Sequence, residues 1–365
     1  MNYHFSISCR ALLLTAFLTV SCLLSAQTLL NKYQPNVTPE GAVYYLPKTI
    51  VRIAVQVEKT TYTPGDFCAY AHKYMKLNDV VQQPVATYRV TTLSLTQEGV
   101  ADTSRCYMVK FNSKSTGTNM TLADDGRLLA INAQPITIKA PTAFTPAPRQ
   151  QQQQPRSLLN EEILSAGSTA KMAELTAQEI YDIRESKNQL LKGQADFMPK
   201  DGEQLRIMID QLEHQNTLLT SMFSGTTIRD TTEHVFTYCP QRGIEREVLF
   251  RLSKHRGIVD SDDLSGVPFY ICIEDEHNVP EPVAAAPAKK KSKVGDDGIM
   301  VNIPGKIKIT ITKDQKMMGS FEIHAAQYGN TELLSGELFN RKMITHLQLN
   351  PTTGSIYKID TETLK

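Results

Sequence analysis

Cys68 and His72 stand four residues apart in a segment, 67–77, whose apolar spacing predicts a short helix. On a helix this spacing places the thiol and the imidazole on one face, which is the geometry that a thiolate and its general base need. No third group that would orient the imidazole is evident nearby in the sequence. We therefore interpret the pair as a packed cysteine beside a surface histidine, and the sequence assigns no catalytic residue.

Two clusters of carboxylates could hold a hard cation through their oxygen atoms. The denser cluster is Glu274, Asp275 and Glu276, followed by His277, and the second spans 260–263. Neither has the ligand spacing and central glycine of a calcium loop, so solvated turns at strand ends are the favoured interpretation. Glu274, Asp275 and Glu276 are therefore weak metal candidates, and the sequence predicts no cofactor.

The local motifs of several enzyme classes are missing from the sequence. There is no Gly-x-Ser-x-Gly elbow, no Ser-x-x-Lys followed by its partner motifs, no phosphate-binding loop, and neither His-Glu-x-x-His nor Cys-x-x-Cys. The sequence leaves open whether the protein is an enzyme and favours a non-catalytic one. The alternative is a periplasmic hydrolase whose site is assembled from distant loops, because catalytic triads form in space.

The charge balance argues against a nucleic-acid partner. The 365 residues carry 39 Lys and Arg against 38 Asp and Glu. Residues 1–26 contain one of these charges, Arg10, so their removal leaves 38 against 38. A protein that binds nucleic acid through its phosphates needs clustered Lys and Arg, which a neutral chain without a basic domain does not supply.

The chain begins with a pattern typical of an export signal. Arg10 is followed by 14 uncharged residues, Ala11 to Leu24, and then by Ser25 and Ala26. The small side chain of Ala26 suits a signal peptidase, so we predict cleavage after it. Lipidation at Cys22 is the less favoured alternative. The uncharged run is shorter than the roughly 20 residues that span a bilayer, so no transmembrane span is expected.

Export would place the remaining cysteines in an oxidising compartment. Cys68, Cys106, Cys239 and Cys272 are the disulfide candidates, and four cysteines allow three pairings. Closeness in the sequence favours Cys68 with Cys106 and Cys239 with Cys272. The alternative is four unpaired, buried thiols, because a chain of this length does not need disulfides to fold.

Hydrophobic periodicity predicts strands on both sides of a helical region. Residues 50–58 alternate between apolar and polar side chains, which predicts a half-buried strand. The turn 124–126, Asp-Asp-Gly, predicts a hairpin between strands at 120–122 and 127–131. Further strands are expected at 86–96, 106–111, 233–238, 245–253, 268–274, 306–312, 345–349 and 355–360.

Two helices are expected in the middle of the chain. Thr176 and Glu179 have the spacing of a capping box, and Gly193 stands where a helix C-terminus favours glycine. A second helix opens at 199–202 and stops at Ser224 and the glycine after it. The short loop between them predicts an antiparallel hairpin.

The predicted fold class is α+β: two β-rich regions, sandwich-like or barrel-like and mainly antiparallel, with a central antiparallel helical hairpin. The predicted organisation is a signal peptide (1–26), an N-terminal β-rich domain (27–140), a Gln/Pro-rich linker (141–170), the helical hairpin (171–225), a β segment (226–279), an Ala/Pro/Lys linker (280–297) and a C-terminal β segment (298–365).

Five phrases carry a resemblance to a known family: Tyr-Tyr-Leu-Pro-Lys-Thr at 44–49, Glu-Lys-Thr-Thr-Tyr-Thr-Pro-Gly at 58–65, Ile-Arg-Glu-Ser at 183–186, Met-Pro-Lys-Asp-Gly at 198–202 and Asn-Pro-Thr-Thr-Gly at 350–354. Their order resembles that of an uncharacterised exported Bacteroides-type protein family, a domain of unknown function, over most of the mature chain. The resemblance implies a Gram-negative envelope location, in the periplasm or associated with the outer membrane. It implies no activity, ligand or site residue.

One further pattern resembles a feature of such bacteria. Asp230-Thr231-Thr232 is similar to the O-glycosylation sequon of their exported proteins, with Thr231 as the acceptor. A three-residue pattern arises easily by chance, so an unmodified threonine is favoured and Thr231 is only a candidate.

These observations favour a non-catalytic exported protein of the cell envelope, a binding or structural module that contacts an envelope protein or a glycan. Glycans stack on flat aromatic platforms, and the chain has 14 Tyr but no Trp. Tyrosines in strands and helices usually pack in a core, which is the favoured interpretation for Tyr44, Tyr45, Tyr62, Tyr70 and Tyr74. The helical hairpin packs on its own sheet or presents its apolar stripe to another subunit.

The predicted cleavage site gives a first test. Mass spectrometry of the mature protein is expected to find Gln27 as the first residue. A diacylglyceryl group on Cys22 would establish the lipid anchor instead, and an intact Met1 in a cytosolic fraction would contradict export.

Overall fold

The structure is a computed structural model that describes most of the chain. The predicted leader and nearly all of the linker at 280–297 lie outside the described residues. The described residues are 42–109, 119–148, 153–195, 198–199, 201–242, 245–280, 298–339 and 342–363.

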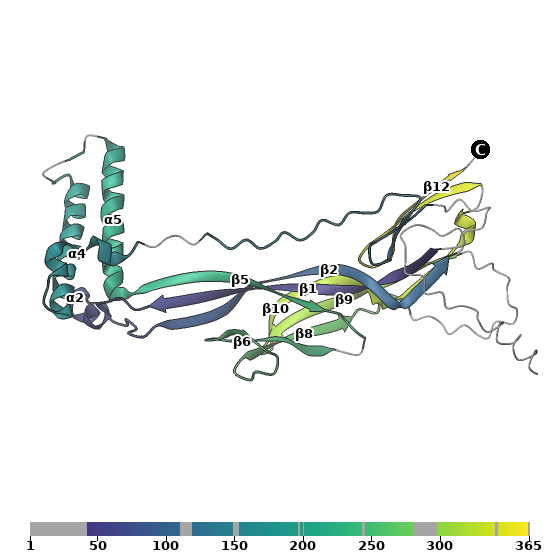
Figure 1. Cartoon of the computed structure of the whole chain (residues 1–365), viewed down its shortest axis with the longest axis horizontal. Coiled ribbons are helices and arrows are strands. Elements are labelled where there is room, and N and C mark those ends of the chain that lie inside the picture. The colour runs from purple at the N-terminus through teal and green to yellow at the C-terminus, as the bar shows by residue number, and fades with distance from the viewer. Residues whose placement is uncertain are drawn as a thin grey trace, which may run out of the picture.

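Three antiparallel sheets and a helical hairpin confirm the predicted α+β class. The molecule is elongated, with the hairpin at one end and the third sheet at the other (Figure 1). The first sheet has the order β2-β1-β5 and contains β1 (Ala42–Thr63), β2 (Val85–Val109) and β5 (Thr226–Tyr238). The second has the order β10-β9-β8-β6-β7 and contains β6 (Arg246–Ser253), β7 (Gly257–Val259), β8 (Val267–Asp275), β9 (Gly298–Lys313) and β10 (Lys316–Ser335). The third has the order β12-β11-β4-β3 and contains β3 (Met120–Leu122), β4 (Leu128–Ile131), β11 (Met343–Leu349) and β12 (Ile356–Thr363).

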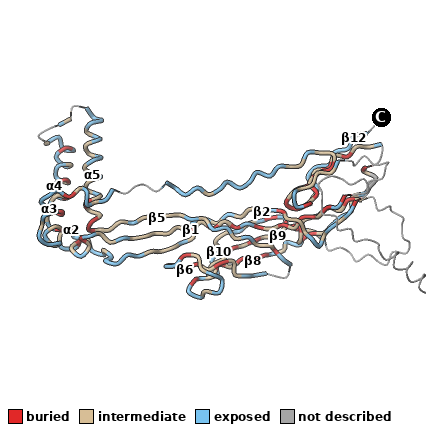
Figure 2. Tube along the Cα trace, in the orientation of Figure 1, coloured by how far each residue is buried: buried red, intermediate tan, exposed pale blue. Residues whose placement is uncertain are grey.

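The first two sheets pack face to face. The predicted alternation at 50–58 is confirmed, since Val51, Ile53, Val55 and Val57 are all buried. Figure 2 shows burial gathering in this middle region, at the base of the helices and near the third sheet. The side chains of the second sheet in the same core include Phe250, Phe269, Ile271, Ile307 and Ile309.

β1 serves two cores with opposite faces. Ala42, Tyr44 and Leu46 are buried in a core shared with the third sheet, whereas the buried positions from Val51 onward are odd-numbered. The β1–β2 register shifts between Tyr45 and Pro47, where Leu46 of β1 lies opposite the four residues 102–105 of β2. The buried face of β1 changes at this irregularity, from even-numbered to odd-numbered positions. This irregularity in the ladder coincides with the point where β1 passes from one core to the other.

Each sheet joins segments that are distant in the sequence. β5 pairs with β1, β8 pairs with β9, and β11 pairs with β4. The segments 27–140, 226–279 and 298–365, expected as separate units, therefore share their sheets. Periodicity indicates which face of a strand is buried but does not indicate its neighbour.

β2 is one strand of 25 residues where the sequence predicted two. Gly99 lies between the predicted strands, is buried, and pairs with Thr49 of β1. A side chain at Gly99 would collide with the carbonyl oxygen of Pro351 in the turn between β11 and β12. This glycine therefore permits a close approach between β2 and that turn instead of ending the strand.

β10 was not expected from the sequence. It follows β9 through a two-residue hairpin turn, in which Asp314 and Gln315 have positive φ angles of 46° and 68°. These positions usually hold Asn-Gly or Asp-Gly, so a turn built from Asp-Gln lacks the expected sequence signal.

The helical end is built around the predicted hairpin of α4 (Thr169–Lys192) and α5 (Gly202–Ser224). Four shorter elements pack near its base: η1 (Cys68–Tyr70), α2 (Ala71–Met75), η2 (Pro155–Leu158) and α3 (Glu161–Leu164). Leu159 and Ile163 are buried in this core, so the segment 141–170, expected as a linker, contributes to helix packing. The expected helix at 67–77 is confirmed as η1 followed by α2.

α4 begins earlier than predicted. Ser168 is its N-cap, and the Ser168 hydroxyl oxygen accepts a hydrogen bond from the Lys171 amide at 3.2 Å. Thr176 lies inside the helix, fully buried, and donates its hydroxyl to the Met172 carbonyl at 2.8 Å. The predicted capping box at Thr176 and Glu179 is therefore wrong, because tertiary packing extends the helix beyond that local signal.

The other helix ends agree with the sequence. Gly193 ends α4 with a φ angle of 69°. Asp201 caps α5 by accepting from the Glu203 amide, and Gly225 ends it with a φ angle of 78°. Positive φ angles of this size favour glycine.

The two candidate caps of α4 can be separated by mutation. Ser168→Ala removes an N-cap acceptor and should lower the free energy of unfolding by about 1 kcal/mol. Glu179→Ala is the control and should change it by less than about 0.5 kcal/mol. Urea unfolding followed by circular dichroism measures both. A larger loss in Glu179→Ala would instead support the capping box.

Candidate functional site

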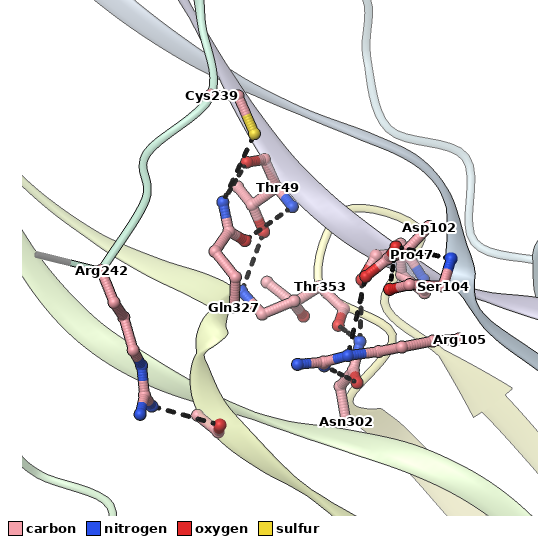
Figure 3. Close-up of polar contacts among 12 residues, drawn as sticks. Pro47, Thr49, Asp102, Ser104, Arg105, Cys239, Arg242, Asn302, Gln327 and Thr353 are labelled. Atoms are coloured by element: carbon pink, nitrogen blue, oxygen red, sulfur yellow. Dashed lines mark hydrogen bonds and ion pairs between the residues drawn. The ribbon is translucent and has the colours of Figure 1, made fainter. Parts of the chain in front are cut away.

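A cluster of polar groups lies where the three sheets meet (Figure 3). Its members come from β1, β2, β9, β10, the turn between β11 and β12, and the segment that follows β5. We call this cluster the polar junction; it includes Pro47, Thr49, Asp102, Ser104, Arg105, Cys239, Arg242, Asn302, Gln327 and Thr353.

Asn302 of β9 links four segments. Its side chain is buried, and its amide nitrogen Nδ2 donates to the carbonyl oxygens of Pro47 at 2.9 Å and Thr353 at 2.8 Å. Its Oδ1 accepts from Arg105 at 3.2 Å, and its main-chain amide donates to the Gly354 carbonyl at 3.1 Å. One amide side chain thus joins β1, β2, β9 and the turn between β11 and β12.

Gln327 of β10 replaces a missing strand neighbour. β5 pairs with β1 as far as Tyr238 opposite Val51, and continuation of that register would place Pro240 opposite Thr49. Proline has no amide proton to donate to the ladder. The Gln327 side chain lies there instead: Oε1 accepts from the Thr49 amide at 3.0 Å, and Nε2 donates to the carbonyls of Thr49 at 2.7 Å and Pro240 at 2.9 Å.

The hydroxyl of Thr49 is fully used as well. Thr49 is completely buried, and its Oγ1 accepts from the Ala326 amide at 3.1 Å and donates to the Thr352 carbonyl at 3.4 Å. Buried polar groups need such partners because an unpaired one costs about 1–3 kcal/mol.

Two arginines lie around the junction. Arg105 pairs with Asp102 at 3.6 Å, and Asp102 also accepts from the Ser104 hydroxyl at 2.7 Å. Arg242 donates to the Gly329 carbonyl at 3.4 Å and lies over the ring of Tyr328, with 6.0 Å between the guanidinium carbon and the ring centroid. Burial raises the pKa of Tyr328, whose hydroxyl donates to the Gln241 carbonyl at 2.7 Å.

The chemistry of the polar junction is structural. Its amides, the Thr49 hydroxyl and Arg105 are engaged in hydrogen bonds or ion pairs within the chain. The Cys239 thiol lies 4.0 Å from Gln327 Nε2, which is a weak contact with an amide and not with a base. The arrangement holds three sheets together, and its contact between a hydroxyl and a carboxylate, that of Ser104 with Asp102, joins near neighbours in the sequence at an exposed site.

Tyr44 reinforces the same link between β1 and β9. Its hydroxyl accepts from the Met300 amide at 2.7 Å and donates to the Met300 carbonyl at 3.3 Å. Burial raises the pKa of Tyr44 to about 12, so the phenol is neutral across the physiological range.

A shallow hollow of about 210 Å³ lies beside β11 and β12, lined by Ala133, His346, Gln348, Lys358 and Asp360. Nδ1 of His346 contacts the carbonyl of Asn132, and Lys358 pairs with Asp360 at 2.6 Å. These contacts are internal to the chain, and the hollow is small and open.

Two of the three carboxylates of the first metal candidate pair with lysines. Glu276 lies 3.0 Å from Lys306, Glu274 lies 3.9 Å from Lys308, and Asp275 accepts from the His277 amide at 2.9 Å. Lys306 also pairs with the carboxylate of the next strand, Glu322, at 2.7 Å, and these two carboxylates raise the pKa of Lys306. Within the described part of the chain no group of three or more His, Cys, Asp or Glu is arranged for a metal ion.

The second acidic cluster forms a turn. Asp263 accepts from the Ser265 amide and pairs with Arg256, both at 2.9 Å. Its hydrogen bonds with Ser265 and the nearby Arg256 guanidinium lower the pKa of Asp263. These contacts agree with the interpretation of residues 260–263 as a solvated turn.

The structure sets Cys68 and Cys106 too far apart for the disulfide that the sequence favoured. Cys106 pairs with Tyr45 in the β1–β2 ladder, whereas Cys68 follows the opposite end of β1. The 17 residues of β1 between Tyr45 and Tyr62 span roughly 55 Å, far beyond the reach of a disulfide. All four cysteines are unpaired in the structure, and a disulfide between Cys239 and Cys272 stays a prediction.

The remaining candidates lie apart from the polar junction. Cys68 is half-buried and His72 is exposed, at the helical end. Thr231 is half-buried in β5, opposite Glu58 of β1. β5 is an edge strand, and glycosylation of Thr231 stays a prediction.

The fold defines an elongated α+β protein in which a polar junction joins three antiparallel sheets and a helical hairpin occupies one end. The chain belongs to the family described as Domain of unknown function (DUF4831), which matches residues 40–357. No curated protein and no solved structure matches the chain. Among the described helices, none combines the length and the apolar character needed to cross a membrane.

Sequence reasoning missed the residues of the polar junction. Asn302 interrupts an apolar stretch between Val301 and Ile303, which is the one local sign of a buried polar partner. The sequence around Gln327 and Pro240 gives no sign of their contact, because that contact depends on β5 and β10 meeting β1 at the same point.

Removal of the Gln327 side chain tests the role of the junction. Gln327→Ala leaves the main-chain groups of Thr49 without partners and should lower the free energy of unfolding by about 2–3 kcal/mol. Gln348→Ala is the matched control, because the Gln348 amide also donates to a carbonyl, that of Gln134, at an exposed site. It should cost less than about 0.5 kcal/mol. Equal losses in urea unfolding would contradict a special role for Gln327.

Proposed function

We propose that this protein is exported to the cell envelope and acts there as a non-catalytic binding or assembly module that contacts another envelope protein. The leader pattern before Gln27 and the resemblance to exported Bacteroides-type proteins support the location. The observation that supports the binding role is the position of the helical hairpin at the far end of a long sheet. The outer apolar side chains of the hairpin remain exposed there.

The free end of the hairpin is the proposed contact surface. Leu191, Met198 and Ile207 form this hairpin tip, and they are 59%, 37% and 52% exposed. Lys187 pairs with Glu213 at 2.6 Å, so the two helices run side by side towards the tip. Exposed apolar side chains with a charged rim are typical of protein contact surfaces.

The first sheet supplies reach and rigidity to this surface. β1 has 22 residues, which at about 3.3 Å per residue extend roughly 70 Å. β1 is hydrogen-bonded on both sides along its helical half, from Val51 to Tyr62. A continuous ladder of this kind holds the hairpin at a fixed distance from the third sheet.

The five N-terminal tyrosines considered as a glycan platform support a protein partner over a glycan. Tyr44 is buried, and the Tyr62 hydroxyl donates to the carbonyls of Val81 at 2.9 Å and Ser224 at 3.0 Å. Tyr45, Tyr70 and Tyr74 are partly buried. Sugar stacking needs an open ring face, and these tyrosines use theirs for packing within the chain.

Site-specific photocross-linking in intact cells tests the proposal. A photoreactive residue at Ile207 should give one discrete adduct in the envelope fraction. The same residue at Ser94, an exposed position in the middle of β2, is the control and should give none. The double substitution Leu191→Ser with Met198→Ser should abolish the adduct while circular dichroism stays unchanged.

Three outcomes would overturn the proposal. They are the absence of an adduct at Ile207, equal adducts at Ile207 and Ser94, and recovery of the full-length chain from the cytosol.

A further inference from the structure

The edge of the third sheet carries an unusually open strand. β12 pairs on one side with β11, from Met343 opposite Thr363 to Leu349 opposite Ile356. On its other side no strand of the described residues pairs with it. All eight residues of β12 are exposed, including Ile356, Tyr357 and Ile359 at 40%, 65% and 39%. Such an edge presents unpaired main-chain groups that can accept another strand.

We infer that β12 pairs antiparallel with β12 of a second copy of this chain, so that the two third sheets join into one continuous sheet across a two-fold axis. This interface lies in the third sheet, at the opposite end of the molecule from the hairpin tip (Figure 1), and it does not depend on the proposed function. A two-fold axis makes the contact self-complementary and closes the assembly at two copies.

The pleat limits the register of this pairing. Residues directly opposite each other in an antiparallel pair point to the same face, whereas consecutive residues of one strand point to opposite faces. The two-fold axis must therefore lie at one residue, the centre of the register, which is then opposite the same residue of the second copy. A centre at Ile359 places Lys358 of each copy opposite Asp360 of the other, which pairs opposite charges.

The neighbouring registers are less favourable. A centre at Lys358 places two lysines opposite each other, and a centre at Asp360 places two aspartates opposite each other. A centre at Thr361 sets Asp360 against Glu362. Like charges directly opposite are destabilising in a sheet, so charge selects the register centred on Ile359.

Existing contacts favour the same register. Lys358 and Asp360 already pair at 2.6 Å within one strand, so the dimer would give a cluster of four alternating charges. Ile359 lies opposite Leu347 of β11, which is fully buried in the core of the third sheet. Ile359 of the second copy would extend that apolar face across the axis. Charged side chains on an edge strand disfavour most pairings with other strands. In β12 they disfavour the neighbouring registers and favour the one centred on Ile359.

Charge reversal combined with sedimentation equilibrium tests this inference on the mature full chain. The unmodified protein should show twice the monomer mass at high concentration. Lys358→Asp and Asp360→Lys should each give a monomer, and the two substitutions together should restore the dimer. Lys316→Asp reverses an exposed charge in the second sheet and is the control that should remain dimeric. Circular dichroism checks that each variant is folded.

Cysteine cross-linking tests the register independently. Ile359→Cys places two thiols opposite each other at the axis and should give a covalent dimer on mild oxidation. Thr361→Cys should not, because Thr361 would face Tyr357 of the second copy. The unmodified chain, with its native cysteines, is the background control.

Four results would overturn the inference. They are a monomer at every concentration, a folded double variant that stays monomeric, dissociation of Lys316→Asp, and equal cross-linking at positions 359 and 361.

Discussion

The structure depends on the need to pair the main chain of β1 where that strand passes between two cores. The buried face of β1 changes at Leu46 and Pro47, where its ladder with β2 is irregular, and close to this point the ladder with β5 ends, two residues before Pro240. The Gln327 side chain supplies the donor and acceptor that a neighbouring strand would have supplied. Without these bonds, the Thr49 main chain would be buried and unpaired, which is costly.

Asn302 solves a related problem two residues earlier in the same strand. It binds the Pro47 carbonyl and the turn between β11 and β12 through one amide, and Arg105 completes its hydrogen bonds. Gly99 and the turn at Pro351 approach closely beside it because the glycine has no side chain. The three sheets are thereby fixed to one another, which gives the elongated molecule a defined length. The proposed role in binding or assembly rests on this defined length and on the different surfaces at the two ends.

Local signals in the sequence were most dependable where a single segment decides its own structure. The alternation at 50–58, the glycine turn at 124–126 and the helix ends at Gly193 and Asp201 all correspond to elements of the fold. They failed where packing overrides a local preference. Thr176 has the sequence signature of a cap but is buried inside α4, and the Asp314-Gln315 turn forms without the usual glycine.

The sequence by itself determined the α+β class, the antiparallel helical hairpin and most strands, because periodicity and turn residues act over a few neighbouring positions. Tertiary structure alone decided which strands share a sheet, and it placed Cys68 and Cys106 at opposite ends of one ladder. It also brought Thr49, Asn302 and Gln327 together. The physical reason is that these contacts join residues more than 200 positions apart, and no local pattern encodes which distant main-chain group a buried amide will satisfy.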